Sequence, residues 1–249
     1  MKTTLPIRRA GRAPTAAACR LFCLPPAGAG ASLFYPWLDA APPDVEVCPV
    51  ALPGREDRLA EPLPASIDAL ADDLSAALAP ALDRPYAIVG YSMGALIGWA
   101  LLQRWRAQGR RAPAMFFALA ARAPSVVLPR DPPLHTLPAA QFRRTLVDIG
   151  GTPRELLEHA DAMALFEPIL RNDLRIAEQY RPAPQDRPMD CALHALFGKR
   201  DVLMGRADVE PWAACTRGAF SMQELDAPHM LPRPALAALL GPMLQRWKR

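Results

Sequence analysis

Short apolar or alternating runs are separated by amphipathic stretches along most of this chain. The runs are shorter than core helices and are typical of strands in a buried sheet. The expected strands cover residues 20–24, 44–50, 87–89, 114–120, 191–197 and 218–225. The expected helices cover residues 32–38, 67–82, 95–106 and 234–247. This strand–helix alternation predicts an α/β fold with a mostly parallel sheet that helices cover on both faces.

Residues 125–188 interrupt the alternation. Several prolines open this stretch, and helical patterns follow at 139–149, 153–159 and 162–181 with no clear strand between them. A helical insertion at this place in such a fold would cap the site. We therefore expect a single α/β domain over residues 1–249, with a helical lid insertion at about 125–188. Its apolar positions are expected to pack helix against helix rather than to contact a ligand.

Composition narrows the possible classes of protein. The 249 residues are 51% hydrophobic and 22% charged, which fits one α/β domain with a substantial core. The net charge of +4 is mild and no basic run is interleaved with aromatic residues, so no nucleic-acid partner is expected. No stretch approaches the ~20 apolar residues of a membrane span, and no signal-peptide pattern is visible. We expect a cytoplasmic protein without a membrane partner.

The five cysteines have no paired spacing. Three of them lie in or beside the apolar runs, namely Cys23, Cys48 and Cys191. Such residues are expected to be reduced core residues and to form neither disulfides nor a metal site.

The stretch Gly90-Tyr91-Ser92-Met93-Gly94 carries the clearest chemical motif. It follows an apolar run and precedes a good helix former. A strand that turns straight into a helix holds Ser92 at a strained apex, where a side chain at Gly90 or Gly94 would collide with its neighbours. Ser92 is therefore a candidate nucleophile, and the Met93 N–H is a candidate oxyanion donor at the positive end of the helix. The bare pattern also arises by chance, so the prediction depends on this context.

A serine nucleophile needs a base, usually a histidine that a carboxylate orients. The chain has four histidines. His135 and His159 lie in the insertion, and His194 lies inside an apolar run. His229 follows the last expected strand in a loop, where sheets of this type place their chemistry. His229 is therefore the predicted base.

Asp201 is the predicted carboxylate, because it follows the strand expected at 191–197. The order Ser92, Asp201, His229 matches that of the α/β-hydrolase fold. Asp226 is an alternative, three residues before the histidine, if its loop folds back. Asp190 begins a strand and would lie at the wrong end of the sheet.

A glycine-rich loop at residues 25–32 follows the first expected strand. Leu33 stands where a dinucleotide fingerprint needs its third glycine, and no Gly-Lys-Ser/Thr follows as in a Walker loop. The loop suits the presentation of bare backbone N–H groups to a reacting oxygen. Ala27 is predicted to supply the second oxyanion donor.

Several segments together resemble the type II thioesterases, the stand-alone editing enzymes of nonribosomal peptide and polyketide synthesis. Residues 24–31 look like their F-P-x-A-G-G loop, and Leu52-Pro53-Gly54-Arg55-Glu56-Asp57-Arg58 is similar to their P-G-R-E-x-R segment. Residues 90–95 look like G-H-S-M-G-A, and residues 197–201 and 228–230 look like the acid and base segments. Tyr91 replaces the common His, Gly30 lies one place late and Met230 stands where Phe is frequent. The shifted glycine leaves the second oxyanion amide open.

The resemblance implies an α/β-hydrolase fold and a substrate class. The substrate would be an acyl or aminoacyl thioester on the phosphopantetheine arm of a carrier protein, with the insertion as a lid over an acyl channel. The residues alone indicate a serine hydrolase that works through an acyl-enzyme and needs neither a metal nor an organic cofactor. A small-molecule esterase or acyltransferase with the same triad stays open, as does a non-catalytic interaction protein. The arginines at 104–111 would either meet an acidic carrier or form a solvated face.

Overall fold

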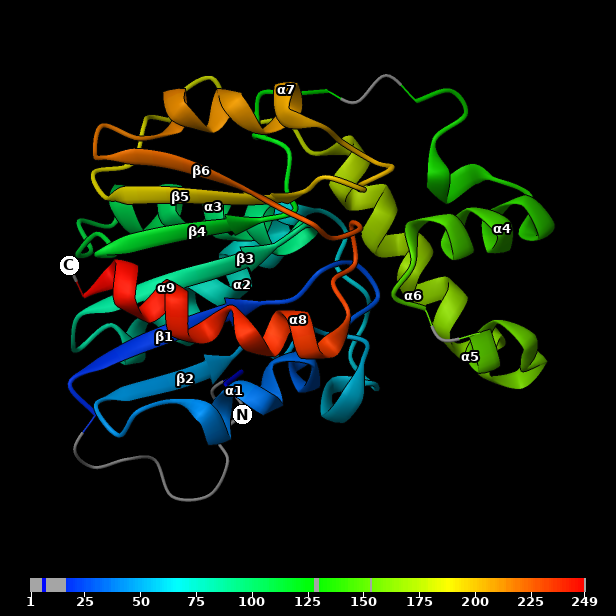
Figure 1. Cartoon of the computed structure of the whole chain (residues 1–249), viewed down its shortest axis with the longest axis horizontal. Coiled ribbons are helices and arrows are strands. Elements are labelled where there is room, and N and C mark those ends of the chain that lie inside the picture. Colours follow the sequence, from blue (N-terminus) through cyan, green and yellow to red (C-terminus); the bar gives the residue numbers. More distant parts are fainter. Residues whose placement is uncertain (1–5, 8–16, 128–129, 153, 249) are drawn as a thin grey trace.

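The computed structural model describes residues 6–7, 17–127, 130–152 and 154–248 (Figure 1). In this part of the chain, six strands form one sheet in the order β2-β1-β3-β4-β5-β6, with parallel neighbours throughout. The strands are β1 (Cys19–Leu24), β2 (Val45–Pro49), β3 (Tyr86–Tyr91), β4 (Met115–Leu119), β5 (Ala192–Gly198) and β6 (Phe220–Leu225). The mostly parallel sheet expected from the sequence is confirmed. β1 to β5 are buried on both faces, which explains their apolar runs.

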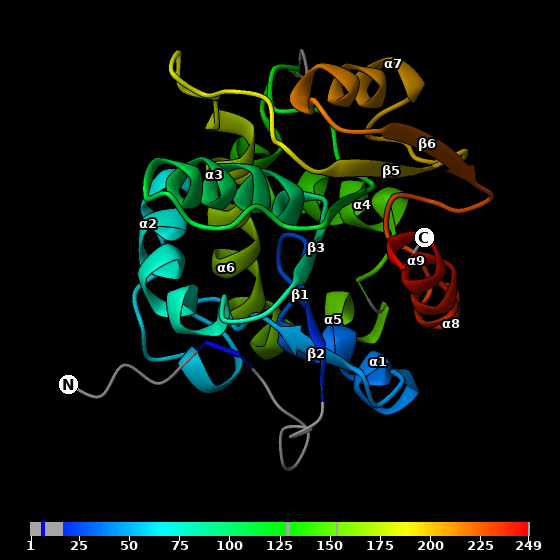
Figure 2. The same ribbon diagram turned by 90° about the vertical axis from the view of Figure 1, so that its left-hand side faces the viewer.

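Helices cover both faces of the sheet (Figure 2). α2 (Ile67–Leu78) and α3 (Met93–Ala107) lie on one face, and α1 (Tyr35–Ala40), α8 (Arg233–Ala238) and α9 (Leu240–Trp247) lie on the other. Each face has its own apolar cluster: Leu74 and Trp105 belong to the first, and Trp37 and Met243 to the second. Short 3-10 helices are η1 (Ala31–Phe34), η2 (Glu56–Arg58) and η3 (Ala79–Ala81). Within the described ranges, no helix has both the length and the apolar character that crossing a bilayer requires.

The chain between β4 and β5 forms further helices beyond the carboxyl ends of the strands (Figure 1). They are η4 (Leu134–Thr136), α4 (Ala139–Ile149), α5 (Arg154–Glu158) and α6 (Ala160–Gln179). Phe142 and Ile149 of α4 share an apolar cluster with Leu170 of α6, so these helices pack against one another. Residues 128, 129 and 153 of the expected insertion lie outside the described part. The division into one domain with a lid stays a prediction.

The structure differs from the sequence expectation over residues 206–215 and 234–247. Residues 206–215 carry no clear pattern, yet they form α7 (Arg206–Val209) and η5 (Glu210–Cys215). The tertiary structure provides the reason, because the fully buried Trp212 donates from its indole to the Ala121 carbonyl over 2.9 Å. The helix expected at 234–247 is divided into α8 and α9. Pro242 lacks the N–H that would bond the Ala238 carbonyl in a continuous helix.

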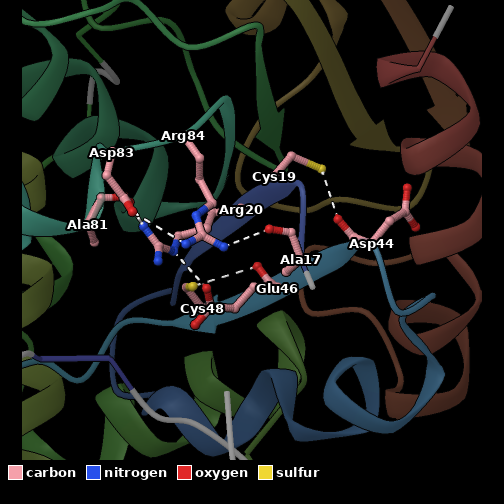
Figure 3. A network of polar contacts seen from close by, with 9 residues as sticks. All are labelled: Ala17, Cys19, Arg20, Asp44, Glu46, Cys48, Ala81, Asp83 and Arg84. Atoms are coloured by element: carbon pink, nitrogen blue, oxygen red, sulfur yellow. Dashed lines mark hydrogen bonds and ion pairs between the residues drawn. The ribbon is translucent and has the colours of Figure 1, made fainter. Parts of the chain in front are cut away.

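A buried ion pair joins β1 and β2 near the amino-terminal end of the sheet (Figure 3). Arg20 of β1 donates from Nε to the Glu46 carboxylate of β2 over 2.7 Å, and the two side chains are 7% and 4% exposed. Arg20 also donates to the Ala81 carbonyl over 2.6 Å and pairs with Asp83. This cluster lies at the opposite end of the sheet from Ser92, since Arg20 is near the start of β1 and Ser92 follows the end of β3.

Candidate active site

Ser92 occupies a sharp turn between β3 and α3. Its backbone has φ 51 and ψ −114, a conformation that residues other than glycine rarely adopt. A Cβ at Gly90 would overlap the backbone of Ala95, and one at Gly94 would overlap the Leu24 carbonyl. Both glycines are therefore required by close backbone approach. The strained serine stays in place because strand, turn and helix are packed around it.

The structure brings Ser92, His229 and Asp201 together in a line. Ser92 Oγ lies 3.0 Å from His229 Nε2, and His229 Nδ1 lies 2.7 Å from Asp201 Oδ2. The Asp201 side chain is fully buried, and its Oδ1 accepts the N–H groups of Leu203 at 2.8 Å and Met204 at 3.2 Å. The remaining carboxylate oxygen faces the ring. This assigns the proton to Nδ1 and leaves Nε2 as an acceptor for the serine hydroxyl.

The alternative carboxylates point elsewhere. The Asp226 side chain is 83% exposed and pairs with Arg200 at 3.0 Å. Asp190 is exposed and pairs with Arg217 at 3.1 Å, at the amino end of β5. Neither contacts the His229 ring.

The other histidines have separate environments. His194 is buried in β5 and its Nδ1 lies 2.8 Å from Ser221 Oγ. His135 pairs with Glu178 over 2.5 Å within the helices between β4 and β5. His159 is exposed beside α6.

Tyr91 has a role that the sequence pattern did not reveal. Its hydroxyl donates to the His229 carbonyl over 2.9 Å and accepts the Leu231 N–H over 2.6 Å. The side chain is fully buried, and burial raises the pKa of Tyr91, so the phenol keeps its proton and can donate. Tyr91 thus fixes the backbone on both sides of residue 230, next to the imidazole that faces Ser92. In the sequence, only the position of Tyr91 directly before Ser92 indicates a role at the site.

The two predicted oxyanion donors are the backbone N–H groups of Ala27 and Met93. In the described part of the chain, neither the Ala27 N–H nor the Met93 N–H has a protein acceptor, whereas the Gly28 N–H donates to Asp173 over 2.8 Å. Ala27 stands in a turn that the Ala29 N–H closes onto Pro26 O over 3.1 Å, with Gly28 at a φ of 74. A turn of this kind needs glycine at its third position. The assignment of Ala27 and Met93 as donors stays a prediction.

Two cavities meet at Ser92 and His229. The first, of about 520 Å³, reaches toward charged side chains that include Arg122, Glu178 and Arg181. The second, of about 630 Å³, lies against the loop of Ala27 and has mainly apolar walls from α4, α5 and α6. Those walls include Leu146, Ile149, Leu156, Phe166 and Leu170. Leu174 and Leu203 border both cavities. The walls of the first cavity are also mainly apolar, and it differs from the second by its charged side chains.

The arginines at 104–111 do not border either cavity. Arg104 pairs with Asp68 and Asp72, each at 2.8 Å, on α2. Arg110 and Arg111 are exposed just before β4, at the opposite edge of the sheet from Ser92. This placement agrees with a solvated face. Among the described residues, no group of three His, Cys, Asp or Glu side chains could hold a metal ion.

Comparison with known proteins agrees with this architecture. A family model described as "Thioesterase domain" matches residues 19–241. The gramicidin S biosynthesis protein GrsT of Aneurinibacillus migulanus is 35% identical over 84% of this chain and 80% of its own. The RedJ thioesterase of the prodiginine pathway of Streptomyces coelicolor is 34% identical, with a TM-score of 0.83 over 92% of this chain and 91% of its own.

A further solved structure extends the likeness. YbtT, a type II thioesterase of the yersiniabactin NRPS/PKS pathway, is 26% identical, with a TM-score of 0.83 over 95% of this chain and 96% of its own. These matches confirm the α/β-hydrolase fold expected from the sequence. The chain therefore belongs to the thioesterase family, among the type II thioesterases of nonribosomal peptide and polyketide pathways, and is a thioester hydrolase.

Proposed function

We propose that this thioesterase hydrolyses acyl or aminoacyl thioesters held on the phosphopantetheine arm of carrier proteins, with Ser92, His229 and Asp201 as its catalytic residues. The observation that carries the proposal is the continuous hydrogen-bonded line from Ser92 Oγ through the imidazole to Asp201, at 3.0 and 2.7 Å. It supports a serine whose proton can be removed as it attacks.

The proposed cycle has two halves. His229 Nε2 takes the Ser92 proton as Oγ attacks the thioester carbon, and Asp201 stabilises the imidazolium. The oxyanion is held by the N–H groups of Met93 and Ala27, each contributing about 3–4 kcal/mol to the transition state. The carbon–sulfur bond breaks and the thiol leaves with the proton from His229. Water, deprotonated by His229, then attacks the acyl-enzyme and releases a free acid and Ser92.

Two cavities at one serine suit a substrate with two long arms. The acyl group matches the apolar cavity beneath α4, α5 and α6, because its walls can bury methylene groups. The pantetheine arm contains amides and ends in a phosphate, which need polar and cationic partners. In the other cavity, Arg181 provides a cation for the phosphate and the Glu178 carboxylate can accept amide N–H groups. Arg122 also lines it, but donates to the Val126 and Ala177 carbonyls.

A comparison of substrates and variants tests this function. Wild type should hydrolyse an acyl-carrier protein at least tenfold more efficiently, by kcat/KM, than the matching p-nitrophenyl ester. Ser92→Ala should lose at least about 1000-fold in kcat on the carrier substrate, as expected for removal of a nucleophile. Ser125→Ala is the control, because Ser125 is exposed and lines neither cavity. Preference for the free ester would favour a small-molecule esterase, and an active Ser92→Ala would exclude the mechanism.

A further inference from the structure

The segment Arg55-Glu56 contacts the glycine-rich loop but not Ser92, His229 or Asp201. Glu56 accepts the Ala31 N–H over 3.0 Å and the Ser32 N–H over 3.1 Å. A Cβ at Gly30 would overlap the Glu56 carboxylate, which accounts for the glycine at that position. Glu56 itself has a φ of 50, a strained value for a residue with a side chain. The carboxylate is therefore held at the end of the loop in spite of a backbone cost.

Arg55 holds the same loop from its other side, through α6. Its guanidinium pairs with Asp173 in a bidentate arrangement, with Nη1–Oδ2 at 2.5 Å and Nη2–Oδ1 at 2.9 Å. Asp173 Oδ2 also accepts the Gly28 N–H over 2.8 Å, and Arg55 Nη1 donates to the Ala29 carbonyl over 3.2 Å. The two backbone groups that follow Ala27 are thus bound by one ion pair.

Burial makes this ion pair a poor source of stability. The side chains of Arg55 and Asp173 are 5% and 0% exposed. Removing two charges from water costs about as much as their attraction returns, so an apolar pair would often stabilise the fold equally well. A fully hydrogen-bonded buried pair does fix the positions of its partners, because each charged group would lose its hydrogen bonds in any other position. The geometry that this pair fixes is that of the turn containing Ala27.

We propose that Arg55 and Asp173 are positioning residues for the oxyanion hole. They hold the turn at Pro26–Ala29 so that the Gly28 N–H is occupied and the Ala27 N–H is left for the oxyanion. Because Asp173 belongs to α6, the oxyanion donor is correctly placed only while α6 is seated against the loop. The inference rests on the proposed roles of Ser92 and Ala27, and is independent of the carrier-protein substrate.

A double variant tests the proposal with a simple thioester. Arg55→Gln/Asp173→Asn keeps an amide that can form hydrogen bonds at each position, although Gln is shorter than Arg and has fewer donors, and removes both charges. With octanoyl-N-acetylcysteamine, we expect kcat to fall on the order of 10- to 100-fold, since a misplaced oxyanion donor loses part of its effect, while KM changes less than about twofold. Octaneboronic acid, which forms a tetrahedral adduct with the serine, should bind more weakly by a similar factor. Octanoate, which resembles the ground state, should bind as in wild type.

The matched control is Arg20→Gln/Glu46→Gln, which removes a similarly buried pair at the far end of the sheet (Figure 3). It should lower the melting temperature but leave kcat and boronate affinity within twofold of wild type. The proposal is overturned if both double variants, measured where both are folded, have the same kcat and boronate affinity.

Arg55→Lys provides a second route if the double variant does not fold. It keeps the charge but loses the bidentate geometry, so it should show a smaller loss of the same two quantities. Wild-type kcat and boronate affinity in Arg55→Lys would overturn the proposal. Failure of wild type on carrier substrates would overturn only the proposed substrate, because these measurements use none.

Discussion

Tyr91 contacts the backbone around His229 but is not one of the candidate catalytic residues. Its hydroxyl joins the His229 carbonyl to the Leu231 N–H, both of which are buried. Removing the hydroxyl leaves a donor and an acceptor unsatisfied, at a cost of about 1–3 kcal/mol each unless the loop shifts. A shift of this loop moves the imidazole that faces Ser92.

We expect Tyr91→Phe to lower kcat about tenfold with little change in KM, since proximity of the base is lost only partly. Steady-state kinetics on a thioester provide the measurement. Tyr86→Phe is the control, because Tyr86 is equally buried on the same strand and its hydroxyl donates to the Arg111 carbonyl over 2.6 Å, away from the site. Equal kcat values for the two variants would contradict a positioning role for Tyr91.

At the scale of elements, one face of α4 borders the apolar cavity and the other faces solvent. Ile149 is 7% exposed and lines the apolar cavity, whereas Val147, two residues earlier, is 63% exposed. The helix has polar residues between its apolar positions, so the sequence predicts which side is buried. It does not predict that part of the buried side borders a cavity at Ser92.

Ile149→Trp should shorten the acyl chains that the enzyme accepts. The larger side chain fills the apolar cavity, so hydrolysis of a dodecanoyl thioester should fall on the order of tenfold relative to an acetyl thioester. A series of N-acetylcysteamine thioesters from C2 to C12 measures this ratio. Val147→Trp makes the same change on the exposed side of α4 and should keep the wild-type ratio. An unchanged ratio in Ile149→Trp would assign the acyl group to the other cavity.

At the scale of the whole molecule, the candidate catalytic residues and the buried Arg20–Glu46 ion pair lie at opposite ends of the sheet. The candidate catalytic residues follow the carboxyl ends of β3, β5 and β6, while the Arg20–Glu46 pair lies at the amino end. His194 lies within β5, and burial, followed by the nearby Arg246 charge, lowers its pKa below the ordinary value of 6.5. The folded chain thus keeps this imidazole neutral where the unfolded chain takes up a proton.

The free energy of unfolding should therefore decrease as the pH falls below about 6.5, and the His194 contribution should be fully retained above that value. His194→Asn should make the stability less dependent on pH between about 7.5 and 5.5. Urea unfolding at both pH values measures the difference. His159→Asn, a change at an exposed histidine, should keep the wild-type dependence. A wild-type slope in His194→Asn would show that other groups control the acid response.

The strands and the serine turn could be predicted because local rules decide them. Apolar runs of strand length form a buried parallel sheet, and Gly90 and Gly94 are the residues that a tight strand-to-helix turn permits. A local rule also explains the start of α2, where the Ser66 hydroxyl accepts the Ala69 N–H over 3.0 Å. α7 and η5 were not predicted, because the burial of Trp212 and its hydrogen bond to Ala121 depend on contacts between distant parts of the chain.

The sequence by itself determined the order of the elements and the residue types at the ends of three strands, because periodicity and backbone sterics act over a few neighbouring residues. Only the tertiary structure decided that Asp201 rather than Asp226 reaches His229, since the two carboxylates differ in where their loops turn. It alone brought Asp173 to Arg55 and Gly28, across 118 and 145 positions of the chain. Contacts over such separations depend on how helices and sheet pack, which no local pattern records.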